Sequence, residues 1–468
     1  MRVSLFCISV GVLSACATRQ PPPQAPPAPV TEAEEIKMGR EADRYLAATR
    51  RFYDDSAWGR YVQQVGERLA AKCERPSLPW TFRVMDDPSV NAFALPGGFV
   101  YVTRGMLAYL NSEAQLAAVL GHEIGHVAAR HVVSRSTRVG LTRMGLVVTT
   151  AGGAEAPVQG SPQRLEALLV AHSREAEHKA DALGLHYMSD AGYDPTAMPA
   201  VLRAIERAVG RGTPPAWLAA HPNWEHRFEN LAQERSKLNN PGTLLEYDAY
   251  LAHIHGLTFG PDRRNGYFQG TRFVVPARGY QITFPDGWTL ASDGSAVRGR
   301  SPAQDAVVEV THTDQPTADS AASFFFAKFA SLREPLTRTQ VNGFTVVSAV
   351  FSWLRQERLR GVVNFVESRG RVYRVMAYTS SDRWSVNQWG LERVLRSFQP
   401  IPEAEILAAQ PLRVTTFALD RSTSLAALVK TRPAAAEPAD LALMNQVPAD
   451  STLPAGQRVK WVVRAPQN

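Results

Sequence analysis

The chain has 468 residues, a net charge of +7 from 51 Lys+Arg against 44 Asp+Glu, and 45% hydrophobic residues. At about 100–200 residues per domain, this length predicts two to four domains. The ordinary hydrophobic content excludes wholesale disorder and a polytopic membrane protein. The sequence has no dense block of lysines and arginines, which argues against a nucleic-acid partner, and its 3 cysteines are too few for a disulfide framework.

The first residues predict an export signal. A short positive start precedes an apolar stretch, residues 3–13, that is too short to span a bilayer. It ends in Leu13-Ser14-Ala15-Cys16, which resembles the bacterial lipobox, so residues 1–15 are expected to be removed and Cys16 to be lipidated. Ordinary signal cleavage after Ala15-Cys16-Ala17 is the alternative, and it would leave the protein unanchored in the periplasm.

A proline-rich spacer follows within residues 16–30. The run from Pro21 to Pro29 predicts a stiff polyproline II tether that would hold a folded body off a membrane. Because Ala17 stands where an aspartate would alter sorting, the lipobox resemblance implies the outer membrane of a Gram-negative source, facing the periplasm. Cys73 has no catalytic constellation around it in the sequence, so it is expected to be a buried structural residue.

The folded body is predicted to start with helices and to continue with strands. Thr31-Glu32-Ala33-Glu34 fits a capping box, and helical patterning continues with gaps to about Ala71. Residues 76–102 alternate as strands do, and Pro96-Gly97-Gly98 interrupts them as a turn. A strand region therefore leads into the part of the sequence that carries chemistry.

A second capping box, Ser112-Glu113-Ala114-Gln115, opens a helix that carries His122-Glu123-Ile124-Gly125-His126. A spacing of four residues puts His122 and His126 on one helical face, where both imidazoles can reach one tetrahedral zinc ion. Glu123 projects to the side, where it can take a proton from the attacking water and pass it to the leaving amine. The motif is short, and histidines that merely face solvent are the alternative.

A second helix, expected over residues 163–190, supplies a third ligand. Glu177 and Asp181 are four residues apart and so share a helical face. Two histidines and one glutamate form a common catalytic zinc set that leaves one position open for water. Asp181 can accept a hydrogen bond from a ligating histidine and fix its tautomer. Glu175 is the rival carboxylate, but it lies off this face and is expected on the solvated surface.

From Asn91 to Arg227 the sequence resembles the HtpX- and BepA-like zinc metallopeptidases, whose zinc-site fold is of the gluzincin type. Several blocks in the family's order carry the resemblance: residues 91–98, residues 101–105, His122 to His126 with Arg130-His131, Glu177-x-x-Ala180-Asp181-x-x-Gly184, residues 191–195, and His221-Pro222 with Arg227. The resemblance implies that His122, His126 and Glu177 bind one zinc ion per chain and that Glu123 is the general base.

The resemblance implies further roles for His221 and Arg227. In relatives the corresponding histidine lies near the metal, where it assists the transition state or fills the open coordination position and keeps the enzyme latent. A helix-entry residue before Pro222 is the plain alternative for His221. Arg227, like His221, is a candidate for stabilising the oxyanion.

Two segments near the cleft are expected to handle substrate. Asn91, Ala92, Phe93 and Ala94 would form an edge strand to which an extended peptide adds, with a packed inner strand as the alternative. Residues 134–161 are rich in glycine and small side chains, and they are predicted to be a mobile flap over the cleft. Disorder without consequence is the alternative for this second segment.

The second half of the chain carries no catalytic constellation. Residues 241–278 look like a glycine-punctuated connector found in bacterial relatives of this enzyme type. Residues 279–400 predict a compact α+β domain around an antiparallel sheet. Residues 401–468 read as strand, helix, helix and strand, and they resemble the small peptidoglycan-binding LysM module, with a β-rich cap as the alternative. The tetratricopeptide repeats that end BepA-like relatives are not visible.

The predicted fold is therefore multidomain: a mainly α (α+β) gluzincin metalloprotease domain over residues 31–240, then the connector, the α+β accessory domain and the LysM-like module. The expected function is a zinc endopeptidase that acts on misfolded or unassembled cell-envelope proteins, tied to the membrane by its lipid and with peptidoglycan as a further candidate partner. The alternative is an envelope assembly or peptidoglycan-binding scaffold with a latent metal site. Because a scaffold has no need to keep Glu123 beside two metal-spaced histidines, the enzyme is favoured.

Overall fold

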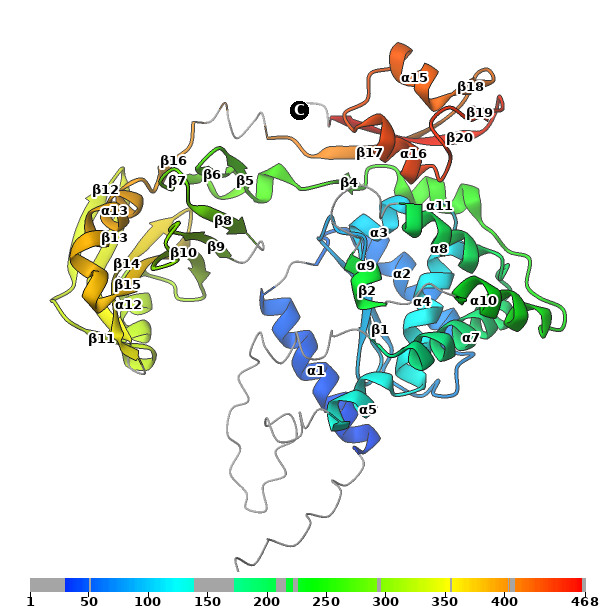
Figure 1. The fold of residues 1–468 in the computed structure, drawn as a ribbon, viewed down its shortest axis with the longest axis horizontal. Helices are drawn as coiled ribbons and strands as arrows, with labels where there is room; N and C mark the ends of the chain where they lie inside the picture. Colours follow the sequence, from blue (N-terminus) through cyan, green and yellow to red (C-terminus); the bar gives the residue numbers. More distant parts are fainter. Residues whose placement is uncertain are drawn as a thin grey trace, which may run out of the picture.

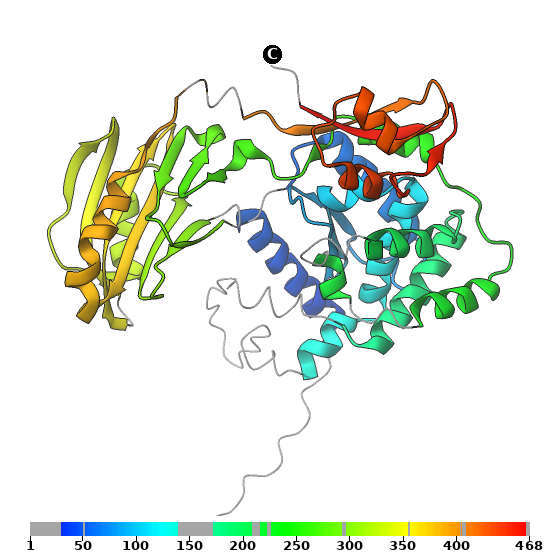
Figure 2. The same cartoon turned by 45° about the horizontal axis from the view of Figure 1, so that its top comes forward.

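The structure is a computed structural model that describes residues 30–49, 52–138, 172–207, 216–221, 226–292, 296–353, 356–402, 404 and 409–464. The expected signal peptide, Cys16, nearly all of the proline-rich spacer and most of the expected flap lie outside these residues. Within the described ranges, no helix is both long enough and apolar enough to cross a bilayer. Figures 1 and 2 show a helical body that carries the His-Glu motif and, beside it, a sheet-rich accessory domain.

The helical body begins with two helices and a small sheet. Helix α1 spans Glu32–Thr49 and α2 spans Ser56–Ala70, and the sheet has the order β1 (Thr81–Met85), β3 (Phe99–Thr103), β2 (Ala92–Leu95). The predicted capping box at Thr31 is confirmed, since Glu34 N–H donates to Thr31 Oγ1 and Thr31 N–H donates to Glu34 Oε2. Strand β2 pairs antiparallel with β3 and lies at the edge of this sheet.

The helices that carry the motifs pack directly on each other. Helix α3 spans Arg104–Tyr109, α4 spans Glu113–Ala128, α5 spans His131–Arg138 and α7 spans Arg174–Asp190. Ser112 caps α4 as the second capping box predicts, accepting a hydrogen bond from Gln115 N–H at 3.2 Å. Where α4 crosses α7, a Cβ atom on Gly184 would lie 2.8 Å from the carbonyl carbon of Gly121. Glycine at this crossing therefore lets the two backbones approach closely.

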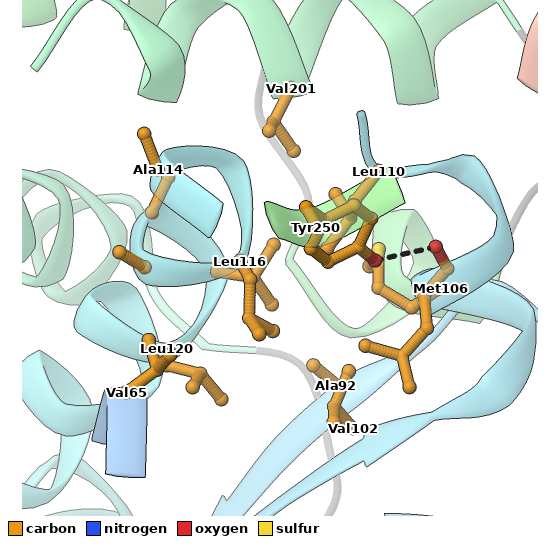
Figure 3. Packing of buried hydrophobic residues seen from close by; sticks show 14 of the residues in the cluster. Val65, Ala92, Val102, Met106, Leu110, Ala114, Leu116, Leu120, Val201 and Tyr250 are labelled. Atoms are coloured by element: carbon orange, nitrogen blue, oxygen red, sulfur yellow. Dashed lines mark hydrogen bonds between the residues drawn. The ribbon is translucent and has the colours of Figure 1, made fainter. Parts of the chain in front are cut away.

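Further helices cover the two motif helices and close the core. They are α8 (Ala197–Arg207), α9 (Ala216–Ala220), α10 (Arg227–Ser236) and α11 (Tyr247–Ile254), followed by the short strand β4 (Thr258–Phe259). Figure 3 shows Leu116 and Leu120 of α4 among the buried side chains, with Ala92 and Val102 of the sheet beside them. Tyr250 reaches into this cluster, and its hydroxyl donates to Leu107 O at 2.7 Å.

The C-terminal segment has the predicted order of strand, helix, helix and strand. It contains β17 (Leu412–Ala418), β18 (Thr423–Ser424), α15 (Leu425–Thr431), α16 (Pro438–Met444), β19 (Thr452–Leu453) and β20 (Arg458–Arg464). Strand β17 pairs with β20 on one side and with β4 on the other, both antiparallel. Trp461 and Val462 belong to the same buried cluster as Leu116 and Leu120. The segment is therefore built into the core of the helical body.

The accessory domain lies in the chain between β4 and β17. Its large sheet has the order β11-β13-β14-β15-β10-β9-β8, with β12 also paired to β13. The bounds are β8 (Thr289–Ser292), β9 (Ala296–Arg300), β10 (Ala306–Thr313), β11 (Ala330–Leu332), β12 (Thr337–Val341), β13 (Phe344–Trp353), β14 (Gln356–Ser368) and β15 (Arg371–Ser380). All its pairings are antiparallel, in agreement with the α+β prediction.

Two layers cover the two faces of this sheet. Helix α12 (Ala318–Lys328) packs on one face, while α13 (Trp384–Arg396) packs on the other with a second sheet of order β16-β7-β6-β5. The second sheet contains β5 (Tyr267–Gln269), β6 (Arg272–Val275), β7 (Tyr280–Thr283) and β16 (Gln399–Pro400), and short 3₁₀ turns span Arg263–Asn265, Pro276–Arg278 and Ser381–Arg383. Strands β5 and β6 come from residues 241–278, so the second part of the expected connector pairs within this domain.

Candidate metal centre

Four buried side chains from three parts of the helical body converge on one point. His122 and His126 come from α4, Glu177 from α7, and His221 directly follows α9. One ligand atom from each lies within 4.8 Å of the others. Nε2 of His122 is 3.1 Å from Nε2 of His126, and Nδ1 of His221 is 3.0 Å from Oε1 of Glu177. The structure thus brings together the three ligands expected from the sequence and adds His221.

This donor set fits zinc. Imidazole nitrogen and carboxylate oxygen are the ligands that zinc takes in catalytic sites. Ligand atoms bound tetrahedrally at about 2.0–2.1 Å from an ion lie roughly 3.3 Å from one another. The measured separations here, 3.1 Å between the two α4 imidazoles and 3.4 Å between His126 Nε2 and Glu177 Oε1, match that spacing. Buried groups at such distances are best explained by a cation between them.

Asp181 orients His122 and is itself held by Arg227. Oδ1 of Asp181 lies 2.8 Å from Nδ1 of His122, and Arg227 Nη2 donates to the same oxygen at 2.6 Å. Burial would raise the pKa of Asp181, but the charge of Arg227 and the hydrogen bond from His122 outweigh it and lower this pKa. Asp181 is therefore a carboxylate that accepts Nδ1–H and leaves Nε2 of His122 free to bind metal.

The electrostatics of His122 link metal binding to proton release. Burial would lower the pKa of His122, but its hydrogen bonds to Asp181 and Glu177 outweigh burial and raise this pKa to about 9. Because a metal ligand must be deprotonated, the raised pKa of His122 means that a proton and a metal ion compete for this imidazole.

His126 has histidine neighbours that the sequence motif does not assign. Nδ1 of His131 lies 2.9 Å from Nδ1 of His126, and the ring of His172 stacks on His126 with centroids 3.9 Å apart. Burial lowers the pKa of His131 to about 4, so this imidazole is neutral and can accept a hydrogen bond. The available signal in the sequence is the Arg130-His131 pair, which closely follows α4.

Glu123 lies beside the four ligands and contacts Trp217. Its carboxylate is 1% exposed, and Trp217 Nε1 donates to Oε1 at 3.3 Å. Nε2 of His221 lies 3.4 Å from the same oxygen. Trp217 precedes His221 by four residues, so both project from the same side of α9, and the tryptophan ring also lies 5.2 Å from the guanidinium of Arg227. Sequence reasoning missed Trp217, because its contact with Glu123 joins segments 94 residues apart.

The residues expected to bind substrate lie in or beside the edge strand β2. Ala92, Phe93 and Ala94 lie in the edge strand β2, and Asn91 directly precedes it, with Asn91 N–H donating to Thr103 Oγ1. The segment that leads into β2 is tied to α9, because Trp217 N–H donates to Val90 O at 3.1 Å. The edge strand therefore lies near the helix that carries Trp217.

Comparisons with known proteins agree with the centre. Residues 57–235 match the family model described as Peptidase family M48, a stretch that includes every candidate ligand. The "Beta-barrel assembly-enhancing protease" of Escherichia coli (strain K12) is 28% identical over 243 residues, which cover 50% of this chain and 50% of that protein. The "Mitochondrial metalloendopeptidase OMA1" of Schizosaccharomyces pombe is 33% identical over 177 residues, or 37% of this chain and 52% of that protein.

These similarities leave much of each protein unmatched. The chain spans about half the length of the curated relatives it matches. Among solved structures, the cyanobacterial PsbP (CyanoP) of Synechocystis sp. PCC 6803 is similar over 29% of this chain and 95% of that chain, with 19% identity and a TM-score of 0.24.

Proposed function

We propose that the protein is a zinc-dependent endopeptidase, because residues 57–235 match the family model described as Peptidase family M48. The observation that carries the proposal is the convergence of His122, His126 and Glu177, with a further carboxylate, Glu123, directly beside them. Three ligands with an adjacent general base are what metal-assisted hydrolysis of a peptide bond requires. A site that only stabilised the fold would have no use for Glu123.

The roles of the side chains follow from their contacts. His122, His126 and Glu177 would hold a zinc ion, which when bound would supply the Lewis acid that polarises the scissile carbonyl and acidifies the attacking water. Glu123 accepts the proton of that water and delivers it to the leaving amine. Trp217 holds the Glu123 carboxylate through its indole N–H. Asp181 keeps His122 in the tautomer that binds metal.

His221 supports a latent state of the site. One of its ring nitrogens faces Glu177 at 3.0 Å and the other faces Glu123 at 3.4 Å, so the imidazole fills the space between the ligands and the base. A fourth donor in that position closes the site to water and substrate. We infer that His221 must swing away before turnover, after which it can assist the transition state. Arg227 is a positioning residue in this proposal, because its guanidinium is bound to Asp181.

The proposed substrates are misfolded or unassembled envelope proteins. The Escherichia coli relative is named for enhancing β-barrel assembly, and the lipobox at Cys16 would place this protein at the outer membrane facing the periplasm. An extended peptide would pair with the edge strand β2, antiparallel to its backbone. Resistance of Cys16→Ser protein to lipid labelling in its native host, with wild type labelled, would support the anchor, and labelling of both would contradict it.

Replacement of the general base tests the enzymatic proposal. Glu123→Gln should cut the cleavage of unfolded casein by roughly 10²–10⁴-fold while zinc content stays near one ion per chain, since general-base catalysis contributes about that much. Glu175→Gln is the matched control, because Glu175 is an exposed carboxylate at the start of α7. Full proteolysis by metal-loaded Glu123→Gln protein would show that the assignment is wrong.

The second candidate is a scaffold that binds peptidoglycan and rarely cleaves. The strand-helix-helix-strand order of the C-terminal segment favours it. Purified peptidoglycan should then retain wild-type and Glu123→Gln protein equally, and casein should remain intact with both. Cleavage that depends on Glu123, with no retention on peptidoglycan, would exclude the scaffold.

A further inference from the structure

The two ring nitrogens of His126 have different surroundings. Its Nε2 lies in the ligand cluster, 3.1 Å from Nε2 of His122 and 3.4 Å from Oε1 of Glu177. Its other nitrogen, Nδ1, lies 2.9 Å from Nδ1 of His131, and no other hydrogen-bond partner of this atom is found among the described residues. The second histidine of the metal helix therefore relies on His131 to satisfy the nitrogen that does not face the ligands.

The contact between the two Nδ1 atoms has only one polarity that suits a metal site. The two nitrogens can share a single proton. If His131 held that proton, His126 would carry its own on Nε2, and the metal-binding atom would be blocked. With the proton on Nδ1 of His126, its Nε2 keeps a lone pair for the metal. His131 is only partly buried, so its own proton on Nε2 can be hydrated.

A regular helix would not bring these two histidines together. Five residues at about 100° each would leave their side chains about 140° apart around the helix axis. Helix α4 ends at Ala128, and Arg130 then adopts a φ of 56° before α5 begins at His131. Residues other than glycine rarely adopt this left-handed conformation unless the surrounding contacts enforce it. The break between the two helices therefore turns His131 back toward His126.

Contacts with the first helix hold this break in place. Oε2 of Glu35 on α1, a residue that is 1% exposed, lies 3.0 Å from Nε of Arg130. Nη2 of Arg130 donates to Val30 O, directly before α1. Val30 also belongs to the same small buried cluster as Val133 of α5. The position of the first turn of α5 is thus set by a buried ion pair, a hydrogen bond and apolar packing.

The neighbouring imidazole of His172 cannot replace His131 as the acceptor. The rings of His172 and His126 stack, with centroids 3.9 Å apart and an interplanar angle of 24°. His172 therefore lies over the face of the His126 ring, whereas an imidazole N–H points outward in the plane of its ring. The stack limits tilting of the His126 ring, but it does not decide which ring nitrogen carries the proton.

We propose that His131 is the positioning residue for His126: its Nδ1 accepts the Nδ1–H of His126 and so presents Nε2 to the metal. Each histidine of the metal helix then has its own orienting partner, since Asp181 accepts from Nδ1 of His122 at 2.8 Å. A neutral imidazole orients its neighbour without adding a charge to the site. The inference rests on the zinc site of the proposed function and does not depend on proteolysis.

Two substitutions of nearly equal shape test the hydrogen bond. Leucine and asparagine at position 131 fill similar volumes, but only asparagine offers an oxygen near the position of Nδ1. Each is placed in full-length Glu123→Gln protein, and zinc affinity is measured by competition with a chromogenic chelator. His131→Leu should weaken zinc binding by about 10–100-fold, as is typical when a metal ligand loses its orienting partner. His131→Asn should retain most of the wild-type affinity.

A matched control and a second readout separate orientation from packing. His255→Leu removes an exposed imidazole whose Nδ1 lies 3.4 Å from Thr415 Oγ1, far along the chain from the metal ligands, and it should leave zinc affinity unchanged. Melting temperatures are measured for each chain with and without zinc. The metal-free melting temperatures of His131→Leu and His131→Asn should be similar, whereas added zinc should raise that of His131→Asn more.

Opposite results would overturn the inference. Unchanged zinc affinity in His131→Leu would do so, and so would equal losses in His131→Leu and His131→Asn, because packing alone would then explain both. If His131→Leu fails to fold without metal, His131→Asp decides. A carboxylate accepts more strongly, so this variant should bind zinc at least as tightly as wild type, and weaker binding would contradict the role.

Failure of the proposed function gives a different pattern. Wild-type protein that takes up no zinc would overturn the proposed function and this inference together. Zinc-loaded wild type that cleaves no casein, combined with the expected difference between His131→Leu and His131→Asn, would contradict the peptidase proposal alone and support the positioning role.

Discussion

The carboxylate of Asp181 on α7 lies 2.8 Å from Nδ1 of His122 on α4. The helix that supplies the third ligand therefore also sets the orientation of the first one. The same carboxylate neutralises Arg227, which is 1% exposed. Asp181 thus orients a metal ligand and also balances the buried charge of Arg227. Substitutions can separate these two roles.

Replacing Asp181 with asparagine should lower both the stability of the fold and the affinity for zinc. Loss of the carboxylate removes the nearest charged partner of the Arg227 guanidinium and leaves the Glu177 carboxylate 3.7 Å from its Nη2, which should cost about 3–5 kcal/mol of unfolding free energy. Loss of tautomer control should weaken zinc binding by about 10–100-fold. Denaturant titration and competition with a zinc chelator measure the two effects. Combining Asp181→Asn with Arg227→Met should restore much of the stability and none of the zinc affinity, and restored affinity would contradict the orienting role.

Replacing Trp217 with phenylalanine removes the donor to Glu123 while keeping a ring in place. A hydrogen bond to a charged group is worth about 1.5–3 kcal/mol, so kcat/KM for casein should fall by about tenfold to a hundredfold with zinc content unchanged. Trp461→Phe is the matched control, because it deletes an indole hydrogen bond of the same 3.3 Å length to Pro433 O, far from the metal centre. Equal activity of both variants would contradict the assignment.

Adding a methyl group at Gly184 should separate the two ligand helices. A Cβ atom there would lie 2.8 Å from backbone atoms of Gly121 and His122, so α7 must move away from α4. Gly184→Ala should therefore destabilise the fold by about 1–3 kcal/mol and weaken zinc binding. In α2, a Cβ atom on Gly59 would meet no other atom within 4 Å, and Gly59→Ala should stabilise the protein by about 0.5–1 kcal/mol. Thermal melts of both variants give the changes in stability, and the difference between melts with and without zinc reports the change in zinc binding.

Lys460 should make stability depend on pH. It is fully buried on β20, where its side-chain nitrogen donates to Ala108 O at 2.6 Å and to Leu110 O at 2.8 Å. Burial lowers the pKa of Lys460 well below its ordinary value. In the pH range between the lowered pKa and about 10.4, the unfolded chain binds more protons than the folded one, so unfolding free energy rises with pH.

The measurement compares Lys460→Met with wild type. Methionine cannot titrate, so the stability of wild type relative to the variant should grow between about pH 7 and about pH 9.5. Guanidinium denaturation at about pH 7 and at about pH 9.5 gives the difference in unfolding free energy between wild type and Lys460→Met at each pH. Lys430→Met, at an exposed position of the same segment, should stay within about 0.5 kcal/mol of wild type at each pH. A wild-type advantage that stays constant from about pH 7 to about pH 9.5 would show that Lys460 keeps its charge when buried.

Local geometry explains what could be read from the sequence in advance. The spacing of His122 and His126 follows from one turn of helix, and the caps at Thr31 and Ser112 depend on neighbouring residues alone. The contact between α4 and α7 could not be predicted from local spacing, because spacing within a helix does not determine which helices pack together. Glu177 was expected from the helical face that it shares with Asp181 and from the resemblance to a known family, and the Gly121–Gly184 crossing provides the physical reason why α4 and α7 meet.

Contacts between distant segments account for what was missed. Trp217 lies 94 residues after Glu123, and a lone tryptophan in a short helix carries no signal of such a partner. Strands β5 and β6 were assigned to a connector because they are short and glycine-flanked, whereas their pairing depends on β7 and β16. The 82% exposure of Trp389 on α13 also depends on the fold, and nothing in the local sequence announces it.

The pairing of β4 with β17 brings Thr258 and Phe259 beside residues that follow some 150 positions later in the chain. The accessory domain is thus inserted into a loop of the helical body, and the chain enters and leaves it beside the β4–β17 pair. During synthesis the body must wait for the accessory domain to be made before β17 and β20 can complete its core.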